Sequence, residues 1–280
     1  MLSEKTRIDA HIEKILIGSR NLLLFLFVSS LLAVVAYKFI PVYYTPLMFI
    51  RVYEQVRDSK SIKLEHKWMP LKQIAQPLAQ AVVASEDNLF LDHDGFDMIQ
   101  IQKARADAEK GKRVRGASTI SQQTAKNVFL WPGRTYLRKG IEAYFTVLIE
   151  WIWGKERIME VYLNSIEMGD GIYGAEAVAQ AHFKKPAYKL TKAEAALIAA
   201  TLPNPRKFNS AKPSPYMLKR QTKIMSLMGK LLKIEMGYDS GDPDSESGSR
   251  KVRRRKKLRA ESDTTVRLPE KNIYIRTIII

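Results

Sequence analysis

The sequence contains no cysteine, which excludes disulfide bonds, thiolate metal sites and thiol nucleophiles. It also has no internal repeat and no clear run of alternating polar and apolar residues of the kind that predicts a β-strand. Metal-binding patterns are missing too. The acid-rich stretch 84–97 fails the spacing of an EF-hand calcium loop, and His93 has no second histidine at a ligand spacing. A mainly α-helical domain without a structural metal is the remaining expectation.

Acidic residues are scarce relative to basic ones. The 280 residues include 46 Lys and Arg against 29 Asp and Glu, which gives a formal net charge of +17. Such an excess indicates an anionic partner, and charge alone leaves phosphate groups, anionic lipid and nucleic acid open. Since 46% of the residues are hydrophobic, the chain can form one globular domain of roughly 100–200 residues with appendages.

One long uncharged run lies between Arg20 and Lys38. At about 1.5 Å per residue, and with the aromatic residues that follow it, this run matches the roughly 30 Å hydrocarbon core of a bilayer. A mixed-charge segment precedes it instead of the short basic region of a signal peptide, and no clear cleavage site follows. The sequence therefore predicts a cytoplasmic N-terminus at 1–20, a transmembrane anchor at 21–43 and a membrane-proximal connector at 44–65.

Helix start and stop signals recur through the rest of the chain and predict a helical domain at 66–238. One predicted helix runs from Asp97 to Glu109 with a stop at Gly111, and a second runs from Tyr136 to Trp153 with a stop at Gly154. A third begins at a capping box formed by Thr191 and Glu194 and ends just before Pro203. The last begins at Ser214 and Pro215 and ends at Gly237. After Gly237 the composition becomes Gly/Ser-rich and then strongly basic. This tail, 239–280, is expected to be disordered and without a catalytic role.

Glu86 differs from the other acids of the stretch 84–97. It follows the apolar run 80–85, so its carboxylate is expected at the edge of a core, where a general base could be placed. Asp92 and Asp94 suit a solvated turn instead. Glutamates that cap helices or form ion pairs are commoner than catalytic ones, so Glu86 alone does not decide the function.

A second group of polar residues lies at a predicted helix start. Thr119 and Gln122 have the spacing of a capping box, and a helix start with nearby cations forms an anion site. Ser118, Gln122 and Lys126 are spaced by four, which would place them on one helix face. Further downstream, Arg138 and Glu142 form either an exposed ion pair worth a few tenths of a kcal/mol or a pair that faces a cleft.

These segments together resemble the signature motifs of the peptidoglycan glycosyltransferases. The matching motifs are Glu86-Asp87-x-x-Phe90-x-x-His93-x-Gly95-x-Asp97, Gly116-x-Ser118-Thr119-Ile-x-Gln122-Gln123-x-x-Lys126-Asn127, Arg138-Lys139-x-x-Glu142, and later stretches at 155–164, 173–177, 194–197 and 202–205. The resemblance covers about residues 66–235 and is closest to the monofunctional branch, the biosynthetic peptidoglycan transglycosylases. Consistently, the Ser-x-x-Lys and Lys-Thr-Gly triplets of penicillin-binding transpeptidases are absent.

The resemblance implies a lysozyme-like helical domain on the periplasmic face of the inner membrane, with the N-terminus in the cytoplasm. It implies polymerisation of lipid II into β-1,4-linked glycan strands, with release of undecaprenyl diphosphate and inversion in a single displacement. Glu86 would be the general base, and Glu142, the second family glutamate, would orient cations or substrate. No cofactor would be required, although a divalent cation, Mg²⁺ or Mn²⁺, could assist. The expected partners are lipid II, the growing glycan chain, membrane lipid and wall-synthesis proteins such as transpeptidases, and nucleic acid is not expected.

The family match also implies a role for each remaining motif residue. Lys126 and Arg134 would bind the donor diphosphate, and the residues that would line the donor cleft are Ser118, Gln122, Gln123 and Asn127. Arg138 or Lys139 would assist in that cleft or in folding, and Phe90 would form an apolar wall. The motif scaffold would consist of Asp87, His93, Gly95, Asp97 and Thr119. No residue is expected to bind a metal. The chain departs from the family at 182–184, where His-Phe-Lys replaces the commoner Tyr-Phe-Gly.

Two other classes of protein compete with this reading. A lytic transglycosylase would share the fold and a catalytic glutamate but cleave the glycan, and it would have no diphosphate for the Lys126 and Arg134 region to bind. A membrane-anchored scaffold would bind wall polymer without catalysis, and it would have no need of Glu86, Lys126 and Glu142 together.

Overall fold

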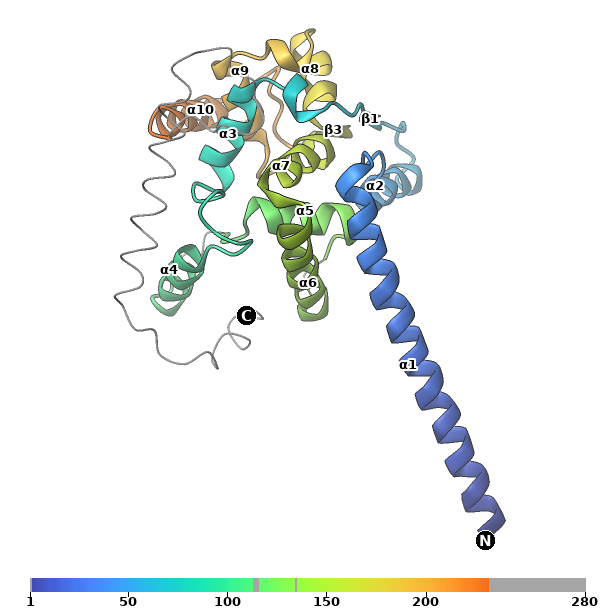
Figure 1. Cartoon of the computed structure of the whole chain (residues 1–280). Coiled ribbons are helices and arrows are strands. Elements are labelled where there is room, and N and C mark those ends of the chain that lie inside the picture. The colour runs from blue at the N-terminus through green and yellow to red at the C-terminus, as the bar shows by residue number, and fades with distance from the viewer. Residues whose placement is uncertain (1, 113–115, 134, 232–280) are drawn as a thin grey trace. The chain divides into compact units, whose positions relative to one another are not determined.

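The computed structural model describes residues 2–112, 116–133 and 135–231 (Figure 1). The chain divides into two compact units, one up to Pro41 and one from Val42 onward. Arg134 and the predicted tail at 239–280 lie outside the described residues.

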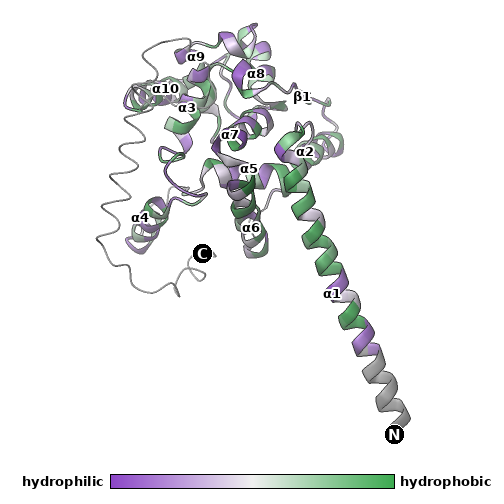
Figure 2. Ribbon diagram, in the orientation of Figure 1, coloured by the Kyte–Doolittle hydropathy of each residue, from purple (hydrophilic) through white to green (hydrophobic). Residues whose placement is uncertain are grey.

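The N-terminal unit is a single helix, α1 (Leu2–Phe39). Its part from Glu13 to Phe39 has a hydropathy of 2.3 and is long and apolar enough to cross a membrane by length and composition (Figure 2). The prediction of an apolar helix here agrees with the structure, but its limits differ from the predicted 21–43. The helix starts earlier and stops before Pro41, because proline has no N–H to donate and restricts the residue before it.

The predicted connector at 44–65 contains a helix that was not expected from the sequence, α2 (Pro46–Arg57). Thr45 caps it by accepting a hydrogen bond from the N–H of Met48, and Pro46 occupies the first helical position, where no N–H is needed. Met48 is completely buried, whereas Phe49 and Tyr53 are exposed. The segment is therefore an amphipathic helix that belongs to the second unit.

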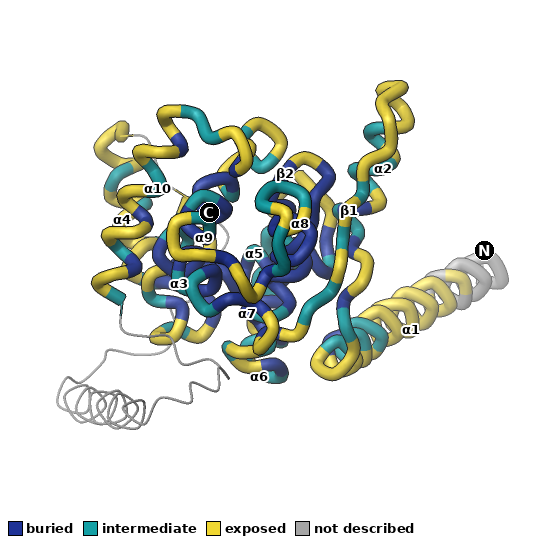
Figure 3. Tube along the Cα trace, turned by 90° about the horizontal axis from the view of Figure 1, so that it is seen from above, coloured by how far each residue is buried: buried dark blue, intermediate teal, exposed yellow. Residues whose placement is uncertain are grey.

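Helices build most of the second unit, which confirms the mainly α prediction. They are η1 (Leu71–Gln73), α3 (Gln76–Glu86), α4 (Met98–Glu109), α5 (Ile120–Phe129), α6 (Tyr136–Ile152), α7 (Gly154–Ser165), α8 (Ala175–Phe183), η2 (Ala187–Lys189), α9 (Lys192–Thr201) and α10 (Pro215–Met228). In Figure 1, α5 and α7 lie in the middle of the unit, and Figure 3 shows that both are largely buried. Helix α5 packs against α6 and α7, while α3, α9 and α10 pack together.

Three very short strands form the sheet in the described part of the chain. They are β1 (Glu65–His66), β2 (Glu167–Gly169) and β3 (Ile172–Tyr173), in the order β1-β3-β2. Strand β3 pairs parallel to β1 and antiparallel to β2. No strand was expected from the sequence, because segments of two or three residues are too short to show the alternation of polar and apolar residues that identifies a strand.

The predicted helix signals mostly hold. Asp97 caps α4 by accepting from the N–H of Gln100 at 2.9 Å, and Thr191 forms the predicted capping box. The last helix is an exception, since α10 ends at Met228 and not at Gly237. Gly229 comes first along the chain, and glycine costs about 1 kcal/mol relative to alanine inside a helix, so the helix stops there.

Candidate active site

Glu86 is the last residue of α3, and its carboxylate contacts side chains from two other helices. Oε1 accepts hydrogen bonds from Ser85 Oγ at 2.8 Å and from Arg220 Nη2 on α10 at 3.3 Å. Oε2 accepts one from Gln123 Nε2 on α5 at 3.4 Å. The side chain keeps 16% of its surface exposed. Glu86 is therefore a partly exposed carboxylate whose orientation is fixed by hydrogen bonds from three side chains.

Asp87 is buried and links the end of α3 to the start of α5. It accepts from the backbone N–H of Ile120, the first residue of α5, at 2.9 Å. A carboxylate in this position also interacts favourably with the positive end of the helix dipole. His93 donates from Nε2 to Asp87 at 3.0 Å, because its Nδ1 accepts from the N–H of Gly95 and cannot be the protonated nitrogen. Asp87 thus holds α5 and the 88–95 turn together.

Gly95 and Thr119 form a second link between the same segments. Thr119 Oγ1 donates to the carbonyl oxygen of Gly95 at 2.6 Å while its side chain also caps α5. Gly95 has a φ of +90°, and a Cβ there would lie 2.8 Å from Cγ2 of Thr146. Both the backbone conformation and the close packing require glycine at this position.

A cationic cluster lies between α5 and α6. Glu142 is buried and bonds to Arg138 Nη1 at 2.7 Å and to Lys139 Nζ at 2.5 Å. Burial lowers the pKa of Lys126, with Arg138 and Lys139 lowering it further and Glu142 raising it. Because three cations share one carboxylate, the cluster keeps a positive excess suited to an anion such as a diphosphate. The Arg138–Glu142 pair is buried, so the reading as an exposed surface pair is wrong.

Three residues predicted to contact substrate, Phe90, Gln122 and Ser118, are placed differently from that expectation, whereas the predicted cleft residue Gln123 is partly exposed. Phe90 is completely buried, so it belongs to the core that supports the site and not to a substrate wall. Gln122 is buried, and its side chain accepts from the N–H of Thr119 within the capping box. Ser118 is exposed but precedes the first turn of α5, so it does not share a helix face with Lys126. Gln123 contacts Glu86.

Asn127 is buried, and its Nδ2 has no hydrogen-bond partner among the described residues. Unsatisfied buried donors are rare in proteins, so this amide is available to a bound ligand. Arg134, the predicted partner of Lys126, lies outside the described residues. Asp92 and Asp94 are exposed, as expected for turn residues.

Two residues that contact Glu86 were not identified from the sequence, and Lys155, which begins the motif stretch 155–164, was given no role there. Ser85 and Arg220 contact Glu86 directly, and Arg220 lies 134 residues away along the chain. Lys155 donates to the carbonyl oxygen of His93 at 2.5 Å and to Glu150 at 2.6 Å, and its ammonium group lies 4.7 Å from the ring centroid of Phe90. The excess of cations on the last helix was the one available signal for Arg220, but it does not distinguish one cation from another.

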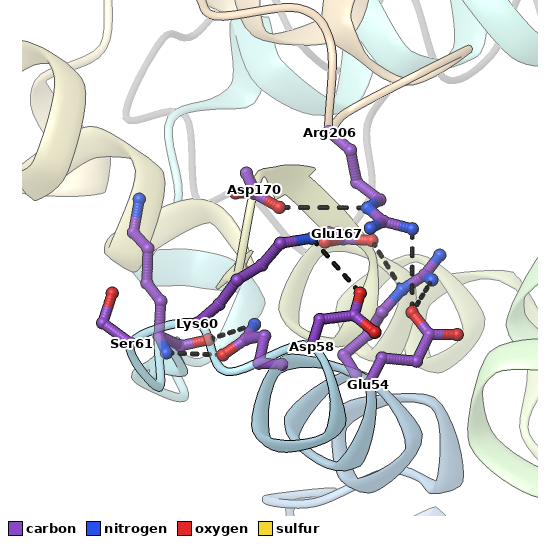
Figure 4. A pocket seen from close by; sticks show the side chains of 10 residues that line it. Glu54, Asp58, Lys60, Ser61, Glu167, Asp170 and Arg206 are labelled. Atoms are coloured by element: carbon purple, nitrogen blue, oxygen red, sulfur yellow. Dashed lines mark hydrogen bonds and ion pairs between the residues drawn. The ribbon is translucent and has the colours of Figure 1, made fainter.

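A separate charged cavity of about 270 Å³ contains none of the predicted site residues (Figure 4). Its residues come from α2 and the segment after it, from the β2–β3 hairpin and from Arg206. Arg51 bonds to Glu54 at 2.7 Å and lies 3.6 Å from Glu167. Burial raises the pKa of Glu167, although the N–H of Gly171 and the charge of Arg51 oppose that effect. The described residues contain no group of three or more His, Cys, Asp or Glu side chains that could hold a metal ion.

Comparison with known proteins identifies the family. The Transglycosylase family model matches residues 54–229, which is more than half of the chain. The chain belongs to the transglycosylase family. The match begins inside α2, so the family domain includes part of the segment predicted as a connector.

Three curated relatives of this transglycosylase family member share the name biosynthetic peptidoglycan transglycosylase. The protein of Bacteroides thetaiotaomicron is 60% identical over 217 residues, which are 78% of this chain and 88% of the relative. The protein of Caulobacter vibrioides is 53% identical over 75% of this chain and 91% of its own length, and that of Bdellovibrio bacteriovorus is 52% identical over 72% and 81%. These similarities confirm the family assignment made from the motifs.

Proposed function

We propose that this chain is a peptidoglycan glycosyltransferase that polymerises lipid II into β-1,4-linked glycan strands and has no transpeptidase activity. The observation that supports this most is that one helix, α5, contacts both parts of the site. Gln123 contacts Glu86, and Lys126, one turn later on the same helix, lies in the cationic cluster. Residues three apart lie on one helix face, so a base and an anion site are held at a fixed spacing.

In the proposed reaction, Glu86 accepts the proton of the acceptor sugar's 4-hydroxyl as that oxygen attacks the anomeric carbon of the donor. The bond between this carbon and the diphosphate oxygen breaks, and its electron pair leaves with undecaprenyl diphosphate. Lys126, together with Arg138 and Lys139, stabilises the negative charge that grows on the leaving group. The donor is α-linked and the product β-linked, so one displacement inverts the anomeric carbon.

The proposal needs no cofactor, and Mg²⁺ or Mn²⁺ would act on the diphosphate rather than through a protein-made metal site. We further propose that α1 anchors the chain in the inner membrane with its N-terminus in the cytoplasm, and that the second unit acts on the periplasmic face, where it meets a lipid-borne substrate and wall-synthesis partners. The hydrolytic alternative is less well supported, because cleavage of a glycan leaves no role for the cationic cluster and the relatives are named as biosynthetic.

Purified full-length protein in detergent should convert labelled lipid II into glycan polymer, measured by gel separation of the products. Glu86→Gln should lower the rate by at least about 100-fold, because it removes the proton acceptor. Asp92→Asn, an exposed turn acid, serves as the matched control and should keep the rate near wild type. Folded wild-type protein that leaves lipid II intact and solubilises wall material would support a lytic enzyme instead.

A further inference from the structure

The two oxygens of Glu86 have different surroundings. Among the described residues, Ser85 and Arg220 both donate to Oε1, whereas Oε2 accepts only the longer 3.4 Å bond from Gln123. A carboxylate oxygen has two lone pairs, so Oε2 keeps acceptor capacity that Oε1 has used. The acceptor hydroxyl of the proposed reaction would therefore meet Oε2, and the side chain that directs Oε2 is Gln123.

Gln123 is in turn held by Tyr162 on α7. Tyr162 has no exposed surface, and its hydroxyl donates to Gln123 Oε1 at 3.1 Å. Burial raises the pKa of Tyr162, and the charges of Glu86 and Asp87 raise it further, so the phenol stays protonated and able to donate. A short chain of hydrogen bonds thus runs from the buried core of α7 through α5 to the end of α3.

The chemistry of these groups fixes the direction of the chain. An ionised carboxylate can only accept hydrogen bonds, so the amide of Gln123 must present its N–H to Glu86 and its oxygen to Tyr162. A flipped amide would place an oxygen against the carboxylate and repel it. The Tyr162 hydroxyl favours the productive orientation because it supplies the donor that the amide oxygen needs.

We propose that Tyr162 is a positioning residue for this reaction. It fixes the amide of Gln123, which in turn directs Oε2 of Glu86 toward the acceptor hydroxyl. This inference rests on the proposed function, and no group on Tyr162 touches the substrate. Its effect passes entirely through Gln123, which distinguishes it from a residue that only fills the core.

The test is a double-mutant cycle of Tyr162→Phe and Gln123→Ala, with kcat and KM measured on lipid II. Phenylalanine keeps the buried ring, so Tyr162→Phe should lower kcat about tenfold and change KM less than about twofold. In the Gln123→Ala background the same change should alter kcat less than about twofold, because the group through which Tyr162 acts is gone. Wild-type kcat in Tyr162→Phe, or an equal loss in both backgrounds, would overturn the proposal.

A second measurement does not depend on activity. The side-chain amide signal of Gln123 can be assigned by nuclear magnetic resonance through its loss in Gln123→Ala, and Tyr162→Phe should shift it and speed its hydrogen exchange. An unchanged signal would contradict the proposed contact. If the contact is present but wild-type protein fails to polymerise lipid II, the proposed function fails while the arrangement of Tyr162, Gln123 and Glu86 stands.

Discussion

Lys126 shows how a single side chain can serve the proposed reaction at a cost to the fold. Its ammonium group is largely buried, beside two other cations and one carboxylate. Burial makes a charged amine less favourable, which is the cause of its lowered pKa. A bound diphosphate would supply the negative charge that the protein itself does not. Binding of a diphosphate beside Lys126 would therefore offset part of the electrostatic cost of burying this ammonium group.

Lys126→Met should lower the rate of glycan synthesis by at least about tenfold and raise the melting temperature at neutral pH. A lowered pKa means that the folded chain gives up this proton first as the pH rises. The stability of the wild type therefore increases as the pH rises toward the ordinary pKa of lysine, and the difference in melting temperature between Lys126→Met and the wild type becomes smaller there. Thermal melting at neutral pH and at about pH 9.5 measures both effects.

Lys139→Met provides the control for this prediction, since Lys139 bonds to buried Glu142 at 2.5 Å. That substitution removes an ion pair and should lower the melting temperature. A lower melting temperature for Lys126→Met as well would show that the buried charge is fully compensated in the free protein.

Among individual residues, those that a family motif specifies could be predicted from the sequence. Glu86, Lys126 and Glu142 could be selected because a family motif specifies each of them. Arg220, Ser85 and the contact of Tyr162 could not, because they depend on how α3, α7 and α10 meet in space. Gln122 and Phe90 were assigned to the substrate because a motif does not tell a residue that supports a site from one that lines it.

The end of helix α3 is linked by hydrogen bonds to the start of helix α5. Asp87 accepts from the first N–H of α5, and Thr119 donates to the carbonyl of Gly95. Since Glu86 ends one helix and Gln123 lies on the other, these links fix the Glu86 carboxylate relative to α5. The geometry of the site depends on this junction.

Gly95→Ala should destabilise the protein by about 2–4 kcal/mol, because it combines a positive φ with a Cβ placed 2.8 Å from Thr146 Cγ2. Urea unfolding measures the loss. Gly111→Ala is the matched control: Gly111 also has a positive φ of +64°, but nothing lies within 4 Å of its added Cβ. That change should cost only about 1 kcal/mol. Equal losses for both variants would show that packing against Thr146 contributes nothing.

Element limits were predictable where one local signal dominates. The caps at Asp97, Thr119 and Thr191 depend on side chains within three residues, and all three hold in the structure. The predicted end of α10 at Gly237 was wrong because an earlier glycine, Gly229, already ends the helix. Helix α2 was missed because its residues were assigned to the membrane-proximal connector, and the strands because each depends on a partner far along the chain.

At the scale of the whole molecule, ion pairs around the charged cavity connect three segments that are far apart in the sequence: α2, the β2–β3 hairpin and the segment that contains Arg206. Glu54 of α2 pairs with Arg51 at 2.7 Å and with Arg206 at 3.6 Å, and Arg206 also lies 4.0 Å from Asp170 of the hairpin (Figure 4). Acidic and basic side chains pair with one another in this network, so the positive net charge of the chain, +17, does not come from these residues. The network ties the start of the family domain to its later part.

Glu167→Gln should make the stability of the whole protein less sensitive to pH. The raised pKa of Glu167 means that the folded chain holds this proton more tightly, so stability falls as the pH rises from the ordinary glutamate value through the raised one. The variant should match the wild type at about pH 4 and exceed it by up to about 1 kcal/mol at neutral pH, measured by urea unfolding. Its amide oxygen can still accept from Gly171, and Arg51 keeps Glu54.

Glu54→Gln is the control, because it removes the short pair to Arg51 and should lower stability at neutral pH. Equal losses in both variants would mean that the ionised form of Glu167 stabilises the fold despite its burial.

The hydrogen-bonded junction between α3 and α5 also determines where the sequence can tolerate change. This junction is made by Asp87, Gly95 and Thr119. The segment between Gly95 and Thr119 is held at both ends, and α4, which it contains, has no buried residue. The entropic cost of lengthening a closed loop grows only slowly, by about 0.6 kcal/mol for each doubling. Insertions, deletions or an attached label in α4 would therefore leave Glu86 and α5 in place, which makes this segment the natural point for evolutionary variation and for engineering.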